Sequence, residues 1–150
     1  MNYDQLHYRI AVTLIRGIGP NLAKNLIAYL GNEQAVFKEK AQNLSKIPGI
    51  GDVLSREIVN QNVLKRAEEE VNFVMKNKIQ PLYFTERDYP YRLKECADSP
   101  IMLYSRGNCD LNGGRFVAIV GTRNATDSGK DNCKKLIADL AALEPRCVIV

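Results

Sequence analysis

The sequence predicts a mixed α/β protein whose front part is helical and whose back part contains a parallel sheet. A helical apolar pattern with a duplicated Gly-x-Gly turn fills the front of the chain. Near the end, a strand, a polar loop, a helix and a second strand follow one another. Between them the apolar spacing changes from that of helices to that of short strands. We therefore expect a helical domain over residues 1–77 and an α/β domain over residues 78–150.

The front part contains an internal repeat. Residues 15–27 (Ile-Arg-Gly-Ile-Gly-Pro-Asn-Leu-Ala-Lys-Asn-Leu-Ile) correspond to residues 47–59 (Ile-Pro-Gly-Ile-Gly-Asp-Val-Leu-Ser-Arg-Glu-Ile-Val), with identical glycines. Pro20 and Asp52 stand where a new helix would begin, a place that favours proline or a capping acid. Two helix-hairpin-helix units are therefore expected, with helices over residues 3–15, 20–30, 33–45 and 52–62.

The glycine turns of this repeat could serve either of two purposes. Glycine lets the backbone approach a phosphate closely, and the free N–H groups at a helix start point toward such an anion. The same kind of turn also joins packed helices that bind no ligand, and such helical domains often contact proteins. The repeat is thus a secondary candidate for DNA binding, through its turn glycines and the cation that follows each turn. These residues are Gly17, Gly19, Lys24, Gly49, Gly51 and Arg56.

The middle of the chain predicts one more helix and then two strands. Residues 63–78 carry apolar side chains at helical spacing, and an acidic run at 68–70 lies largely on the other, solvated side. Short β-like runs follow at residues 80–85 and 101–105. The aromatic residues of this region could stack on unpaired bases, but β-propensity favours packing roles for them: Tyr83, Phe84, Tyr89, Tyr91 and Tyr104.

The last part of the chain predicts a strand–helix–strand unit. Residues 116–120 have the composition of a fully buried strand, and residues 147–150 begin another. Between them runs an amphipathic helix marked by Cys133, Leu136, Ile137, Leu140 and Ala141. In such a crossover the loop after the first strand lies at the carboxyl end of the sheet, where α/β folds bind ligands.

That loop, residues 121–130, matches neither common nucleotide-binding motif. The dinucleotide fingerprint requires a second glycine where Arg123 stands, and the P-loop requires a hydroxyl where Asp131 follows the lysine. We therefore expect no NAD or ATP here, and no cofactor. Hydroxyls and a guanidinium near a helix start instead suit a nucleic-acid backbone. The DNA-binding candidates are Gly121, Thr122, Arg123, Thr126, Gly129 and Lys130. An ion pair between Arg123 and Asp127 is the alternative.

Bulk composition sets wide limits on function. The net charge is +4, which is ordinary for a soluble protein and only weak evidence for a polyanionic partner. The four cysteines form no C-x-x-C pair and His7 is the single histidine, so we expect no metal site. No apolar run is long enough for a membrane span, and the chain start lacks the build of a secretion signal. A cytoplasmic protein with reduced thiols is expected.

Three motifs in order resemble the DNA-processing protein A (DprA/Smf) family. They are Asp88-Tyr-Pro-Tyr-Arg-Leu93, Asp98-Ser-Pro-Ile-Met-Leu-Tyr-Ser-Arg-Gly107, and Val117-Ala-Ile-Val-Gly-Thr-Arg-Asn-Ala-Thr126 with Gly129. The resemblance implies a sterile-alpha-motif-like (SAM-like) front domain and a Rossmann-like domain, with residues 121–123 in a loop that binds the DNA backbone. Because the family continues further, we expect this chain to hold only the first portion of the Rossmann-like domain.

The same resemblance implies a non-enzymatic function. Members of the family bind incoming single-stranded DNA during natural transformation and load the RecA recombinase onto it. A homodimer is implied for the full-length family and is left open for this chain. Two other classes stay open from the residues alone: a Rossmann-like hydrolase of nucleoside monophosphates, and a helical protein-interaction module without affinity for nucleic acid.

Overall fold

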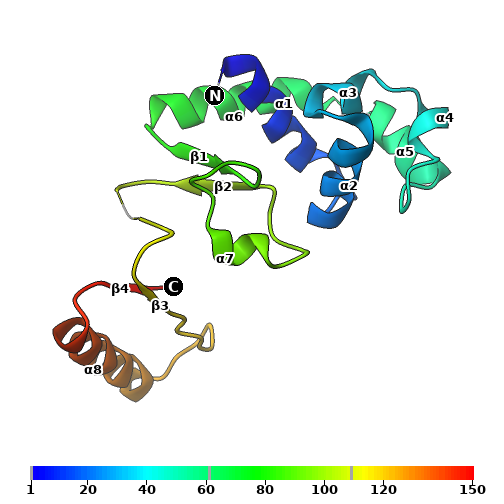
Figure 1. Ribbon diagram of the computed structural model, residues 1–150. Helices are drawn as coiled ribbons and strands as arrows, with labels where there is room; N and C mark the ends of the chain where they lie inside the picture. Colours follow the sequence, from blue (N-terminus) through cyan, green and yellow to red (C-terminus); the bar gives the residue numbers. More distant parts are fainter. Residues whose placement is uncertain (1, 61, 109) are drawn as a thin grey trace. The chain divides into compact units, whose positions relative to one another are not determined.

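The computed structural model describes residues 2–60, 62–108 and 110–150. The chain forms two compact units, Met1–Cys109 and Asp110–Val150, each of which is described by itself (Figure 1). Residue 61 of the expected helix at 52–62 and Cys109 of the expected reduced thiols lie outside the described residues.

The first unit begins with six helices. They are α1 (Tyr3–Leu14), α2 (Pro20–Leu30), α3 (Glu33–Lys38), α4 (Ala41–Leu44), α5 (Asp52–Asn60) and α6 (Val63–Lys76). The structure confirms the expected helices at the start of the chain, on both second arms of the repeat and in the middle segment. α1 packs against α6 and α3, and α2 packs against α3. Figure 1 shows α1 beside α6.

The expected single helix over residues 33–45 is wrong, because the chain breaks at Glu39 and Lys40. Both residues are extended, with ψ of 150° and 146°. The Glu39 carboxylate accepts hydrogen bonds from the backbone N–H of Lys40 at 2.8 Å and from Asn43 Nδ2 at 2.7 Å. These bonds, the one from Asn43 first, hold the pKa of Glu39 below its usual value. The carboxylate thus favours a turn here over a continuous helix.

The two repeats pack against each other reciprocally. Gly17 and Gly49, the first glycines of the two turns, have φ of +82° and +87°. A Cβ atom on Gly17 would lie 3.1 Å from Leu54 Cδ1, and one on Gly49 would lie 2.7 Å from Leu22 Cδ2. Leu22 and Leu54 are equivalent positions of the repeat. The leucine of each repeat therefore packs against the first glycine of the other repeat.

The helical core of the first unit is made of aliphatic side chains from the helices α1 to α6 and from the turn before α5. Its most completely buried members, at 2% exposure or less, are Ile10, Ala11, Val12, Leu26, Val36, Leu44, Ile50, Ile58, Ala67 and Val71. Among the apolar residues of the repeat, Ile15, Leu26 and Ile58 are buried, whereas Val59 is half exposed.

A two-stranded antiparallel sheet completes the first unit. It consists of β1 (Gln80–Tyr83) and β2 (Met102–Ser105), and α7 (Tyr91–Lys94) lies in the connection. Tyr83 and Met102 belong to the same buried cluster as the helices. The compact unit therefore continues to residue 109, whereas the sequence pattern placed a boundary near residue 78.

Arg9 explains why sheet and helices form one unit. This α1 residue is 6% exposed, and its guanidinium lies 3.8 Å from the centre of the Tyr83 ring. It binds Glu33 Oε1 through Nε at 3.2 Å and Glu86 Oε1 through Nη1 at 2.6 Å. Burial, and then the Glu33 carboxylate, raise the pKa of the Tyr83 phenol. One buried cation thus joins α1, α3 and the end of β1.

The second unit is a βαβ crossover, as expected. β3 (Arg115–Val117) and β4 (Cys147–Ile149) are parallel, and α8 (Asp127–Leu143) connects them. Two further hydrogen bonds, Ile119 N to Val150 O at 2.8 Å and Val150 N to Val117 O at 3.0 Å, lengthen the ladder.

The expectation of a fully buried strand at 116–120 is wrong. β3 is half-buried at most, Val120 is 93% exposed, and no described residue of α8 is buried. The reason is that this unit surrounds β3 with one neighbouring strand and one helix, whereas a parallel strand is buried only when helices cover both faces of its sheet. A Rossmann-like sheet remains a prediction. No helix within the described residues has the length and apolar character to cross a membrane.

Candidate functional site

The principal candidate site is the loop between β3 and α8. It leaves the carboxyl end of β3 and leads directly into the amino end of α8. All residues from 121 to 130 are exposed. An exposed loop at the carboxyl end of a parallel strand and at a helix start is where α/β proteins hold anionic ligands.

Thr126 and Gly129 form the cap of α8. The Thr126 hydroxyl accepts a hydrogen bond from the backbone N–H of Gly129 at 3.2 Å, and the backbone of Thr126 is extended (φ −65°, ψ 160°). A Cβ atom on Gly129 would lie 3.2 Å from Thr126 Oγ1, a tight contact. Both residues therefore have a structural role at the helix start, in addition to the binding role proposed from the sequence.

Five of the six predicted residues line one hollow of about 760 Å³. They are Gly121, Thr122, Thr126, Gly129 and Lys130. The lining of the hollow also contains residues that the sequence analysis missed: Ile119, Val120, Asn124, Ala125, Cys133, Lys134 and Ile137. Helical spacing is the signal that could have found the last three, because residues 130, 133, 134 and 137 share one face of a helix.

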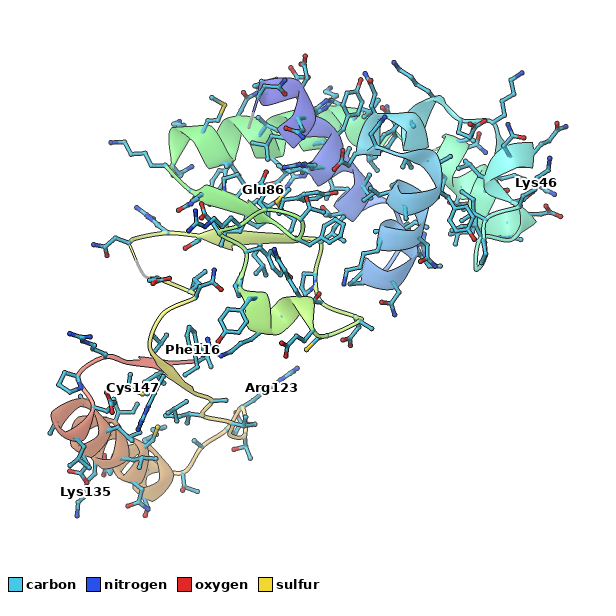
Figure 2. All side chains as sticks on the ribbon, in the orientation of Figure 1. Lys46, Glu86, Phe116, Arg123, Lys135 and Cys147 are labelled. Atoms are coloured by element: carbon cyan, nitrogen blue, oxygen red, sulfur yellow. The ribbon has the colours of Figure 1, made fainter. Side chains whose placement is uncertain are left out.

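Arg123 is the sixth predicted residue and does not line the hollow. Its side chain extends away from α8 (Figure 2). Within the described residues it makes no ion pair, and Asp127, its expected alternative partner, binds Lys130 Nζ at 3.0 Å instead. The guanidinium is therefore free to form a forked pair with an external phosphate.

Gly121 has a conformation that other residues also adopt, and a Cβ atom there would meet nothing within 4 Å. Neither the turn nor internal packing requires glycine at this position. A glycine with open space above it lets another molecule approach the backbone closely.

Two lysines of α8 form weak ion pairs. Lys130 pairs with Asp127, and Lys134 pairs with Asp131 at 3.3 Å. All four side chains are well exposed, so each pair contributes little and is screened by salt. A phosphate group can therefore displace the aspartate from either lysine.

The hairpin turns of the first unit are the secondary candidate. Gly17 and Gly49 are occupied by the reciprocal packing described above, whereas a Cβ atom on Gly19 or Gly51 would meet nothing within 4 Å. Arg56 is exposed.

Lys24 differs from its repeat equivalent Arg56. Its ammonium donates hydrogen bonds to the carbonyl of Ala97 at 2.8 Å and to Ser99 Oγ at 2.9 Å. It also lies 6.0 Å from the centre of the Phe84 ring. Lys24 thus ties α2 to the segment before β2, which supports a structural role for it.

The tyrosines between residues 83 and 104 divide into two groups. Tyr83 and Tyr89 are buried at 1% and 0% exposure, and the Tyr89 hydroxyl donates to the carbonyl of Pro100 at 2.6 Å. Tyr91 and Tyr104 are 47% and 49% exposed. Packing is therefore the role of the first two. Among the described residues, no group of three or more His, Cys, Asp or Glu side chains is arranged to hold a metal ion.

Comparison with known proteins identifies relatives of this chain. The family model of DNA recombination-mediator protein A matches residues 80–150. Protein Smf of Synechocystis sp. is 29% identical over 136 residues, which cover 86% of this chain and 33% of that protein. The DNA processing protein DprA of Streptococcus pneumoniae is 39% identical over 62 residues, and that of Bacillus subtilis 35% over 63 residues. Each of these two matches covers 41% of this chain and 21% of the relative. The matched region thus spans a third or less of these relatives.

Proposed function

We propose that the chain, whose residues 80–150 match the family model of DNA recombination-mediator protein A, is a member of that family, and on that premise that it binds single-stranded DNA through the phosphate backbone. The observation that carries the proposal is the loop after β3. This loop combines an unpaired Arg123, an open Gly121 and the start of α8 on one exposed segment. Backbone N–H groups, a helix start and a guanidinium all favour phosphate oxygens.

The proposed complex is governed by charge and not by base identity. Contacts to phosphates give no direct sequence information, so binding is expected to show little sequence preference. Affinity should fall steeply as salt rises, because each neutralised phosphate releases counterions. The apolar lining residues Ile119, Val120 and Ile137 offer contact to a sugar or base edge beside the phosphate.

We also propose a role for the protein in the cell. The chain would act without catalysis, in the cytoplasm, as part of a protein that loads the RecA recombinase onto single-stranded DNA in natural transformation. The names of the S. pneumoniae and B. subtilis relatives, which describe DNA processing, support this role. The homodimer expected for the whole family is part of the same proposal.

The decisive experiment compares two arginines of the second unit. Arg123→Ala removes the free guanidinium at the carboxyl end of β3, whereas Arg146→Ala removes the same charge just before β4, at the opposite end of the parallel pair. Fluorescence anisotropy with labelled oligo-dT and with a mixed-sequence strand measures both. Arg123→Ala should weaken binding of both strands by roughly 10- to 150-fold, since a hydrogen bond to a charged group contributes about 1.5–3 kcal/mol.

The control, Arg146→Ala, should lower affinity much less, through net charge alone. Equal losses in the two variants would show that only overall charge matters, and an unchanged Arg123→Ala would remove this loop from the interface. Saturable binding of a nucleoside monophosphate, with its hydrolysis, would favour the hydrolase class. Absence of any nucleic-acid affinity would favour the protein-interaction module.

A further inference from the structure

The first hairpin of the repeat holds a loop of its own chain. The ammonium of Lys24, on α2, donates hydrogen bonds to the carbonyl of Ala97 at 2.8 Å and to the hydroxyl of Ser99 at 2.9 Å. Further along, this loop and residues 18–20 of the hairpin turn line one small hollow. Ser99 is 4% exposed. The surface from the turn to Lys24 is thus a binding site that residues 97–102 occupy.

The second hairpin has an equivalent surface, because the two hairpins are copies of one sequence. In the alignment of the copies, Arg56 corresponds to Lys24 and Gly51 corresponds to Gly19. The first glycine of both turns has a positive φ, and each packs against a leucine of the other copy. The same backbone hydrogen bond closes both turns, from Ile18 N to Ile15 O at 3.2 Å and from Ile50 N to Ile47 O at 2.9 Å.

This surface of the second hairpin is open. Gly51, Asp52 and Arg56 are exposed, and a Cβ atom on Gly51 would meet nothing within 4 Å. Asp52 and Arg56 lie one helical turn apart, yet within the described residues neither takes part in an ion pair. Val53 beside them is 77% exposed, more than any other large apolar side chain described in the first unit. Figure 1 shows α5 at one end of the unit, away from β2.

The charges of the second hairpin favour a protein partner over nucleic acid. Residues 46–57 carry two cations and two anions, all of them exposed: Lys46 (Figure 2), Arg56, Asp52 and Glu57. Binding to DNA is driven by an excess of cations that replace counterions, and this surface has no such excess. The Asp52 carboxylate in the first turn of α5 also repels a phosphate at the helix start. A peptide, by contrast, offers carbonyls to Arg56 and N–H groups to Asp52.

We propose that the second hairpin binds a loop of another protein in the way that the first hairpin holds residues 97–102. The guanidinium of Arg56 donates to a backbone carbonyl and to a Ser or Thr hydroxyl of that loop, as Lys24 does to its own loop. The Asp52 carboxylate accepts a hydrogen bond from a backbone N–H of the loop. Val53 contacts an apolar side chain of the loop next to these polar groups.

The partner is a different protein and not a second copy of this chain. In the folded chain, Ser99 is buried and its hydroxyl is already bound to Lys24, so the loop of one copy is not available to the hairpin of another. The proposed surface contains no residue of the loop at 121–130. The interaction is therefore independent of the proposed DNA binding.

The test is an NMR titration of the isotope-labelled 150-residue chain with a blocked peptide, acetyl-Ala-Asp-Ser-Pro-Ile-Met-amide, which has the sequence of residues 97–102. The peptide should shift the backbone resonances of residues 51–57 in a saturable manner. Binding should be weak, because a short flexible peptide loses conformational entropy when it binds. Residues 18–24 should not respond, because the chain's own loop fills their site.

Two variants and a matched control locate the contact. Arg56→Ala should weaken peptide binding roughly two- to tenfold, the range for one hydrogen bond. A peptide that carries Ser99→Ala should also bind more weakly, and Arg56→Ala should then have a smaller effect, because the two groups contact each other. Val53→Asn gives the second hairpin the residue that the first has at Asn21, and it should weaken binding by removing the apolar contact. The control Lys76→Ala removes an exposed cation at the end of α6 and should leave the affinity unchanged.

The outcomes separate this proposal from its alternatives. A lack of saturable shifts at residues 51–57 would overturn it, and so would equal losses in Arg56→Ala and Lys76→Ala or shifts confined to residues 18–24. In the Arg123→Ala chain, shifts at residues 51–57 with oligo-dT and none with the peptide would assign the surface to nucleic acid instead. Arg123→Ala should bind the peptide like the wild type, so a failure of the DNA proposal is measured separately.

Discussion

At the scale of single residues, the four turn glycines fall into two kinds. Gly17 and Gly49 have positive φ and face a leucine of the other repeat, whereas Gly19 and Gly51 have neither constraint. The sequence repeat predicts turns at both places but does not distinguish the first glycine from the second. Only the packing of one repeat on the other does so.

We predict that Gly49→Ala destabilises the first unit and that Gly51→Ala does not. A side chain at Gly49 meets an unfavourable backbone conformation and a contact of 2.7 Å to Leu22 Cδ2. Together these should cost roughly 2–4 kcal/mol of unfolding free energy. Urea unfolding followed by circular dichroism measures both variants. Equal stability of the two would show that Leu22 moves aside and that the positive φ relaxes.

Other residue roles depend on partners that are distant in sequence. The hydrogen-bond acceptors of Lys24, in Ala97 and Ser99, are 73 and 75 positions away. A single sequence shows a cation after a glycine turn, which suggests phosphate binding, but it does not show what lies across from it. Arg9 was detectable in part, because it stands among Leu6 and Ile10 on the apolar face of α1.

At the scale of elements, local sequence patterns predicted well which segments form helices and which form strands. Strong apolar periodicity and helix-start residues located α1, α2, α5, α6 and α8, and short β-like runs located β1 and β2. The break between α3 and α4 was missed, because the Glu39 carboxylate competes with the helix for backbone and side-chain donors. The candidate loop was located correctly between β3 and α8, but its cap and its hollow depend on side-chain geometry.

We predict that Thr126→Ala frays the start of α8, whereas Thr122→Ala leaves it intact. The Thr126 hydroxyl is the side-chain cap of the helix, and losing such a cap costs about 1 kcal/mol. Thr122 lies in the same loop and lines the same hollow without a capping bond in the described structure. Amide hydrogen exchange of residues 127–130 measures fraying. Equal protection in both variants would mean that another group supports the helix start.

At the scale of the whole molecule, the division into compact units differs from the division that the pattern suggested. The family match begins at residue 80, close to the change in apolar spacing, yet β1 and β2 pack with the helices. Sequence periodicity detects where element types change. It does not detect that Arg9 will be buried between Glu33, Glu86 and the ring of Tyr83.

We predict that residues 1–108 fold cooperatively as one piece and that residues 1–77 are markedly less stable. Ending the chain at residue 77 removes Tyr83 and Glu86, so Arg9 loses its ring and one carboxylate, and Met102 leaves the core. Removing partners of a buried charge costs about 3–5 kcal/mol. Thermal melts of the two pieces compare them. Similar melting temperatures would show that the helices are self-sufficient and that the sheet is only attached to them.

The reciprocal contact between glycine and leucine has an evolutionary consequence. A tandem duplication normally frees one copy to diverge, but here the turn glycine of each copy packs against a leucine of the other, Gly17 against Leu54 and Gly49 against Leu22. A substitution in one hairpin therefore also disturbs the packing of the other hairpin. Deletion of either hairpin, or its replacement by an unrelated hairpin, would leave the leucine of the remaining hairpin without the glycine against which it packs. We therefore expect the two hairpins to change together during evolution.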